Sequence, residues 1–262
     1  MSDTVGDMAV DAQLAASHEP WPVVREASLR AEADGYDALW VFDHLAGVAL
    51  GGDRGLEAFT WLGALAEATS TIELGVLVAN AWNRRVGTLA VAAASVAEIA
   101  GRPVHLGIGA GTSPTSRWAA EQHAVRHAVA ADLATRHSRV EEVLDLTEQM
   151  WAPDRPDRLA TFPRPASPPE RIVGVNSVEL SELAGRRADG VNVAWDHPRR
   201  DELLATARRA AGDRRFTLTA WTSWDPALRD PDHPVRRDMR AAGLDRVVLT
   251  LVGELRDFVN GP

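Results

Sequence analysis

Cysteine is absent from the 262 residues, so neither a disulfide nor a thiolate nucleophile can contribute to this protein. The first ten residues, MSDTVGDMAV, contain neither the basic segment nor the apolar core of a secretory signal peptide. No apolar run approaches the roughly 18 residues that a membrane-spanning helix requires. From these absences we expect a cytoplasmic protein that does not insert into a membrane.

Basic residues are also in short supply, because 28 Lys and Arg face 37 Asp and Glu, which gives a net charge of -9. A negative chain is repelled by nucleic-acid phosphates and by anionic lipid. We therefore expect the partner to be a small-molecule substrate rather than nucleic acid or a membrane. The sequence also lacks a Gly-x-Ser-x-Gly elbow and a phosphate loop that ends in Gly-Lys-Ser, so it does not support those two types of site.

Short apolar runs alternate with helical patterns along most of the chain. We interpret eight of these runs as strands, at residues 8–14, 38–42, 72–78, 104–108, 171–175, 190–195, 216–221 and 245–251. Apolar strand interiors are typical of a parallel sheet that helices cover on both faces. Eight strands favour a (β/α)8 TIM barrel over an open doubly wound sheet. We predict a single TIM-barrel domain over residues 1–262, with a Pro-rich excursion at about 152–170.

The helical patterns lie between these runs, at residues 22–33, 88–100, 115–151 and 177–188, and again from 255 onward. The segment 225–240 is rich in Pro and charge, so we expect the seventh helix to be degenerate. The Gly-rich loop 45–55 and the Pro-rich excursion are the segments in which we expect the residues that recognise substrate.

Polar residues follow several of the predicted strands. In a parallel barrel the loops after the strands meet at one rim, and active sites form there. Polar and aromatic groups that converge on one rim would suit a large planar cofactor with a polar tail. The residues concerned are Asp43 and His44 after the second strand, Asn80 and Arg84 after the third, GIGAG (residues 107–111) in the fourth and its loop, and Asn176 and Ser177 after the fifth.

Each of these features also has an ordinary structural interpretation. Asp43 can cap a loop while His44 lies at the surface, and Asn176 and Ser177 are common helix N-caps that could equally hold a phosphate. The third glycine of GIGAG does not stand at the spacing of a dinucleotide fingerprint, since the segment reads Gly-x-Gly-x-Gly and not Gly-x-Gly-x-x-Gly, so an NAD-linked Rossmann dehydrogenase is weakly supported. The acidic residue that such a fingerprint requires downstream would be Asp132, which falls in a helical pattern rather than at the end of a strand.

His123 and His127 stand four residues apart, as metal ligands on a helix do. The sequence offers no Glu between them and no third ligand nearby. We therefore predict no metal site.

Four stretches in order carry a family resemblance. They resemble the luciferase-like monooxygenase superfamily of flavin- and deazaflavin-dependent (β/α)8 barrel oxidoreductases, and together they cover most of residues 27–195. Asp-His after the second strand is similar to the branch that uses coenzyme F420, whereas other branches use reduced FMN with oxygen. The stretches are AEADGYDALWVFDH (31–44), ALAEATSTIELGVLVANAWNRR (64–85), GRPVHLGIGAG (101–111) and ELAGRRADGVNVAW (182–195).

The resemblance implies a role for each site residue. His44 would move a proton to or from the substrate while hydride transfers at the cofactor, and Asp43 would orient the imidazole. A non-prolyl cis peptide is implied at Leu77–Val78, beneath the cofactor ring. Cofactor contacts are implied for Leu77, Val78, Asn80, Arg84, Gly107, Gly109, Ala110 and Gly111, and contacts to the phosphate of its tail for Gly174, Asn176 and Ser177.

Three positions depart from the family pattern. Gly87 stands where a Pro often follows the Arg after the third strand, and Thr112 and Ser113 occupy the place of a Glu that dehydrogenase members use. We expect an F420-dependent oxidoreductase that transfers hydride between F420 and a small organic substrate. An FMNH2-dependent flavin monooxygenase is the alternative enzyme, and a non-catalytic ligand-binding barrel is the alternative of another class. The resemblance also implies a homodimer, which the Ala/Val-rich stretch 88–100 is apolar enough to form.

Overall fold

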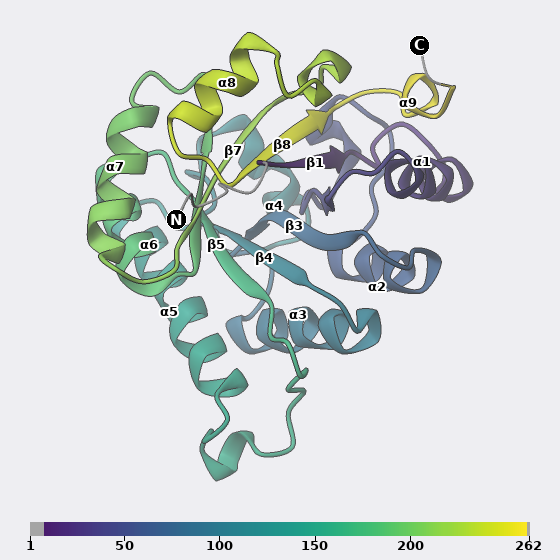
Figure 1. Ribbon diagram of the computed structural model, residues 1–262. Coiled ribbons are helices and arrows are strands. Elements are labelled where there is room, and N and C mark those ends of the chain that lie inside the picture. Colours follow the sequence, from purple (N-terminus) through teal and green to yellow (C-terminus); the bar gives the residue numbers. More distant parts are fainter. Residues whose placement is uncertain (1–7, 261–262) are drawn as a thin grey trace.

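Eight parallel strands form the centre of the computed structural model, which describes residues 8–260 (Figure 1). Neighbouring strands pair in sequence order, and β8 pairs with β1 to close the barrel. The predicted (β/α)8 barrel is therefore confirmed, and the open-sheet Rossmann alternative is wrong. The strands are β1 (Ala9–Leu14), β2 (Ala38–Val41), β3 (Glu73–Asn80), β4 (Val104–Gly109), β5 (Glu170–Gly174), β6 (Gly190–Ala194), β7 (Thr217–Ser223) and β8 (Arg246–Leu251).

Helices surround this barrel, because the apolar strands must be covered on their outer face. Among the residues described, none of the helices combines the length and apolar character that a bilayer-spanning helix needs. The long helices are α1 (Trp21–Ala33), α2 (Ala58–Ala68), α3 (Val86–Ala100), α5 (Leu133–Trp151), α6 (Val178–Arg187), α7 (Arg200–Ala211) and α8 (Pro234–Ala241). The short ones are α4 (Ala120–Ala124), α9 (Arg256–Asn260) and the 3-10 turns η1 (Gly47–Leu50), η2 (Arg117–Ala119), η3 (Asp157–Leu159) and η4 (Pro226–Arg229).

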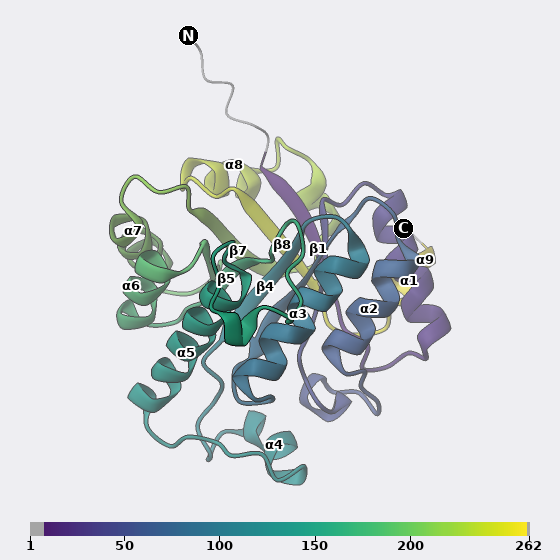
Figure 2. The same cartoon turned by 90° about the horizontal axis from the view of Figure 1, so that it is seen from below.

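The helical pattern predicted over residues 115–151 is wrong as one element. It divides into η2, α4 and α5, with a break in which Arg126 has a positive φ of 60°. Asp132 then begins α5, because its carboxylate accepts a hydrogen bond from the Thr135 amide at 2.7 Å. Figure 2 shows the result, with α4 beyond the ends of α3 and α5, at the same end of the molecule as the loop after β2.

Two further expectations change with the structure. The helix expected to be degenerate in the segment 225–240 is α8, which forms after β7. Pro234 stands in its first turn, where proline needs no N–H partner. The Pro-rich excursion lies at the amino-terminal end of the barrel, where Pro168 and Pro169 line a crevice with His105 of β4. That excursion therefore lies at the opposite end from the rim at which substrate is expected.

A network of paired charges closes this amino-terminal end. The His105 imidazole lies between two carboxylates, with Nδ1 2.9 Å from Glu170 and Nε2 2.9 Å from Glu73. Arg246 joins Glu73 at 2.7 Å to Asp11, which it contacts at 2.9 and 3.1 Å. Buried charges are tolerated when they are paired, so this network fixes the starts of several strands relative to one another.

Candidate active site

A cavity of about 470 Å³ lies at the carboxyl-terminal ends of the strands. Its volume falls within the roughly 300–1,000 Å³ that is typical of sites for cofactors and small molecules. Its walls combine aromatic side chains, glycines and a few polar groups. The residues singled out from the sequence that line it are Asp43, His44, Leu77, Val78, Asn80, Gly109, Ala110, Gly111, Gly174 and Asn176.

Part of the cavity wall is formed by a bulge in β3. The Leu77–Val78 peptide is cis, as the resemblance implies, and the register of β3 on β4 shifts between Val76 and Ala79. Gln13 of β1 donates its side-chain amide to the Leu77 carbonyl and accepts a hydrogen bond at 3.0 Å from the Thr250 hydroxyl. Sequence reasoning did not single out Gln13, although a polar residue inside an apolar strand was a usable signal.

The glycines of β4 and β5 make room for this bulge. A Cβ on Gly109 would lie 2.5 Å from Val78 Cγ2, and a Cβ on Gly174 would lie 2.9 Å from Val78 Cγ1. The space that these glycines leave is therefore taken by Val78, which itself lines the cavity. Their effect on a ligand is indirect, because they determine how far the Val78 side chain enters the cavity.

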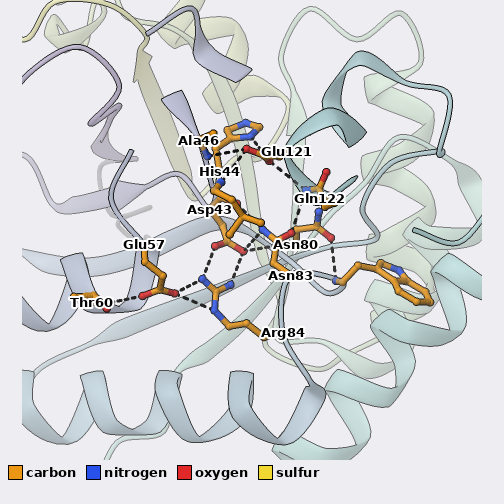
Figure 3. Close-up of polar contacts among 12 residues, drawn as sticks. Asp43, His44, Ala46, Glu57, Thr60, Asn80, Asn83, Arg84, Glu121 and Gln122 are labelled. Atoms are coloured by element: carbon orange, nitrogen blue, oxygen red, sulfur yellow. Dashed lines mark hydrogen bonds and ion pairs between the residues drawn. The ribbon is translucent and has the colours of Figure 1, made fainter. Parts of the chain in front are cut away.

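Asp43 connects the end of β2 to the loop after β3. Its carboxylate binds the Arg84 guanidinium at 2.8 and 2.7 Å and accepts from the Asn80 amide at 2.9 Å, while its carbonyl accepts from the Asn83 side chain at 2.8 Å (Figure 3). Glu57 holds Arg84 from the other side. The structure therefore corrects the orienting role expected of Asp43, since its carboxylate is engaged by Arg84 and the loop after β3.

His44 takes its hydrogen-bond partner from a different element. Its Nδ1 lies 2.9 Å from Glu121 of α4, whose second carboxylate oxygen accepts the backbone amides of Leu45 and Ala46 at 2.9 and 3.0 Å (Figure 3). The Glu121 side chain is only 3% exposed. Burial would raise the pKa of Glu121, but hydrogen bonds from His44 and the two amides outweigh it and lower that pKa below its usual value. Glu121 is therefore ionised at neutral pH.

Trp118 completes the surroundings of His44, with ring centroids 5.7 Å apart. Neither Trp118 nor Glu121 was singled out from the sequence, because both lie in a stretch interpreted as one continuous helix. The local pattern around Glu121 resembles that of any solvated helix face. Only the path of the chain from β4 back over the loop after β2 brings these residues to His44.

Three predicted cofactor contacts, Arg84, Gly107 and Ser177, do not line the cavity, so their contact with a cofactor stays a prediction. Arg84 is only 11% exposed and is bound by carboxylates. A Cβ on Gly107 would lie 2.4 Å from the Val76 carbonyl oxygen, so this glycine accommodates β3. Ser177 caps α6, accepting a hydrogen bond from the Leu180 amide at 3.3 Å.

Neither histidine of the pair considered from the sequence lines the cavity. His123 bonds the Pro114 carbonyl at 3.0 Å through Nε2. Within residues 8–260, no group of three or more His, Cys, Asp or Glu side chains is arranged to hold a metal ion.

Comparisons with known proteins agree with this architecture. A family model described as luciferase-like monooxygenase matches residues 5–249. The F420-dependent glucose-6-phosphate dehydrogenase of Segniliparus rotundus is 24% identical over 233 residues, which cover 85% of this chain and 62% of the relative. The enzyme of the same name from Beutenbergia cavernae is 31% identical over 175 residues, which cover 61% of this chain and 48% of the relative. The chain thus spans less than two thirds of either relative.

Solved structures show the same fold. An F420-dependent secondary alcohol dehydrogenase in complex with an F420–acetone adduct superposes with a TM-score of 0.78, over 97% of this chain and 96% of that chain. The two sequences are 16% identical. At this identity the likeness establishes the barrel and the order of its elements.

Proposed function

Because this chain belongs to the luciferase-like monooxygenase family, we propose that its cavity binds the deazaflavin coenzyme F420 and transfers hydride between F420 and a small organic substrate. The observation that carries this proposal is a histidine at the cavity wall whose Nδ1 is engaged by a buried, ionised carboxylate. Such a pair suits the movement of a proton beside a hydride transfer. The names of the F420-dependent relatives support the choice of cofactor.

The residues present fit a planar cofactor with an anionic tail. Leu77 and Val78 offer an apolar surface on one side of the cavity, and Trp221 of β7, 38% exposed, offers an aromatic one. Asn176 lines the cavity just before α6 begins, and a helix N-terminus favours a phosphate through its unpaired N–H groups and its dipole. Arg136 adds a cationic side chain to the lining.

Bound F420 would supply the carbon that accepts or donates the hydride. His44 would take the hydroxyl proton of an alcohol as hydride leaves its carbon, and would return that proton to a carbonyl in the reverse direction. Phe42 and Trp118 flank the imidazole, with ring centroids 6.2 and 5.7 Å away, and reduce the access of water to it. The chain thereby provides proton transfer and a partly desolvated pocket.

Binding of the two candidate cofactors tests this proposal. Purified protein is titrated with oxidised F420 and separately with FMN, and tryptophan fluorescence is followed. We expect F420 to bind at micromolar concentration, and the quenching to decrease in the variant W118F/W221F but not in the control W151F, whose indole lies at the opposite end of the barrel. Tighter binding of FMN would favour the monooxygenase alternative. Failure to bind either cofactor would favour a non-catalytic barrel.

We also propose that the active form is a homodimer in which α3 contributes to the interface. Ile99 at the end of α3 is 52% exposed, and Val91 and Ala92 are only partly buried on the same helix. Apolar groups left at a surface favour association. Light scattering after gel filtration should give the dimer mass, and the variant I99E should shift the mass toward the monomer. An unchanged monomer mass in both proteins would contradict this arrangement.

A further inference from the structure

We infer that Glu121 is a positioning residue that fixes His44 in the tautomer with its proton on Nδ1, so that the Nε2 lone pair is available to a substrate proton. The catalytic meaning of this inference rests on the proposed function. The tautomer itself is a property of the protein without cofactor, so it can be measured independently of activity.

The hydrogen bond between the two side chains determines which nitrogen carries the proton. Glu121 Oε1 lies 2.9 Å from His44 Nδ1. An ionised carboxylate can only accept, so Nδ1 must be the donor, and a neutral imidazole then has its lone pair on Nε2. The lowered pKa of Glu121 agrees with its acting as an acceptor at neutral pH.

Glu121 can select the tautomer because its own carboxylate is held in place. One oxygen accepts the amides of Leu45 and Ala46 at 2.9 and 3.0 Å, and the other also accepts the Gln122 side-chain amide at 3.2 Å. Gln122 is fixed in turn by Asn83, at 3.1 Å. Rotation of the carboxylate would break several hydrogen bonds at a buried position, where each one is strong.

The other groups around His44 do not compete for its Nδ1 proton. Phe42 and Trp118 present aromatic rings to the imidazole. The adjacent carboxylate, Asp43, is occupied by both terminal nitrogens of Arg84. In the part of the chain that the structure describes, Glu121 is the acceptor that hydrogen-bonds the His44 ring.

The first experiment reads the tautomer by NMR. Side-chain ¹⁵N shifts are recorded for the eight histidines at neutral pH, and the His44 signals are identified by their loss in H44N. We expect wild-type His44 to be protonated at Nδ1, and E121Q to lose this preference. The matched control is E32Q. Glu32 lies on α1, away from His44, and its carboxylate accepts hydrogen bonds from the backbone amides of Ser70, Thr71 and Ile72.

The wild-type spectrum alone can overturn the inference, so the test remains valid even if E121Q does not fold. A wild-type His44 protonated at Nε2 would overturn the inference. An unchanged preference for Nδ1 in folded E121Q would overturn it as well. The same Nδ1 preference in E32Q as in wild type would show that loss of the carboxylate charge in general is not the cause.

The second experiment connects the tautomer to turnover. With oxidised F420 and either 2-propanol or glucose 6-phosphate as the probe substrate, we expect kcat of E121Q to fall about 10²-fold, the usual cost of losing the partner that orients a catalytic group. The KM for the probe and the affinity for F420 should remain unchanged, as they should in E32Q. A wild-type kcat in E121Q would overturn the positioning role. The wild type could fail to bind either cofactor and fail to turn over the probes, while its His44 tautomer still depends on Glu121. In that case the proposed function is wrong and the structural inference stands.

Discussion

Arg84 binds Asp43 through both carboxylate oxygens, and this pair joins the end of β2 to the loop after β3. The Asp43 side chain is 1% exposed and that of Arg84 is 11% exposed, so neither charge has ready access to water. Burial alone would lower the pKa of Arg84, but hydrogen bonds and charge interactions with Asp43 and Glu57 raise it. The junction between the end of β2 and the end of β3, where Asn80 lines the cavity, therefore depends on a buried ion pair.

Replacing Arg84 by methionine should destabilise the protein strongly. The variant R84M keeps much of the side-chain volume but leaves the Asp43 carboxylate buried without a cation, which costs about 3–5 kcal/mol in the free energy of unfolding. Urea denaturation measures this loss. The neighbouring variant R85M, at an exposed position, is the control and should change stability by less than about 0.5 kcal/mol.

The double variant D43N/R84M separates loss of the ion pair from loss of packing. Asparagine can still accept the Asn80 amide, and it removes the unpaired charge. The double variant should therefore be more stable than R84M. If it is equally unstable or worse, the buried charge is not the cause of the effect.

His105 should make stability fall as the solution becomes more basic. Burial lowers the pKa of His105, but hydrogen bonds to Glu170 and Glu73 outweigh it and raise that pKa. Folding then favours the protonated ring, so this contribution is complete below the unfolded value of about 6.5 and is lost as the pH rises through the folded pKa. Unfolding by urea across this interval should show a decline in wild type that is smaller in H105Q. Equal slopes in the two proteins would contradict the assignment.

Glu73 in the same network should act at the acidic end. Burial opposes the shift, but the His105 hydrogen bond and the Arg246 charge lower the pKa of Glu73 to about 2. Its contribution is present above the unfolded value of 4.5 and is lost as the pH falls from there toward about 2. Because the side chain is 29% exposed, we expect it to be on the order of 2 kcal/mol. The variant E73Q should lose less stability over this range than E67Q, an exposed control.

The barrel could be predicted from the sequence because its signals are local. The run Ala38–Val41 is apolar throughout and fully buried, as expected of a strand covered on both faces. The break between α4 and α5 could not be predicted. Arg126 adopts a positive φ there, and no glycine or proline in this segment indicates the end of a helix. The residues around it continue a pattern that a helix would also show.

The candidate site could be predicted only as far as strand order determines it. Asp43 and Asn80 follow strands, so their meeting at one rim follows from the fold. The contacts between individual side chains depend on the direction in which each side chain points and on the path by which the chain returns to the rim. Sequence order placed Asp43 beside His44, whereas the structure turns Asp43 toward Arg84 and brings Glu121 to the imidazole. A contact between residues 77 positions apart leaves no local pattern in the sequence.

A methyl group on Gly109 should narrow the cavity by displacing Val78. The added Cβ would lie 2.5 Å from Val78 Cγ2, and a β-branched side chain has few rotamers into which it can withdraw. Overpacking of this kind costs about 1–3 kcal/mol. If the displaced side chain enters the cavity and the same cost falls on binding, F420 affinity in G109A should drop by about fivefold to 150-fold. The double variant V78A/G109A should recover binding, because it removes the clashing methyl groups. The control G63A adds a methyl group on α2 that meets no atom within 4 Å apart from its chain neighbours and the backbone of its own helix, and it should bind F420 as wild type does. Wild-type affinity in G109A, or a double variant as weak as G109A, would show that Val78 does not shape the cofactor pocket.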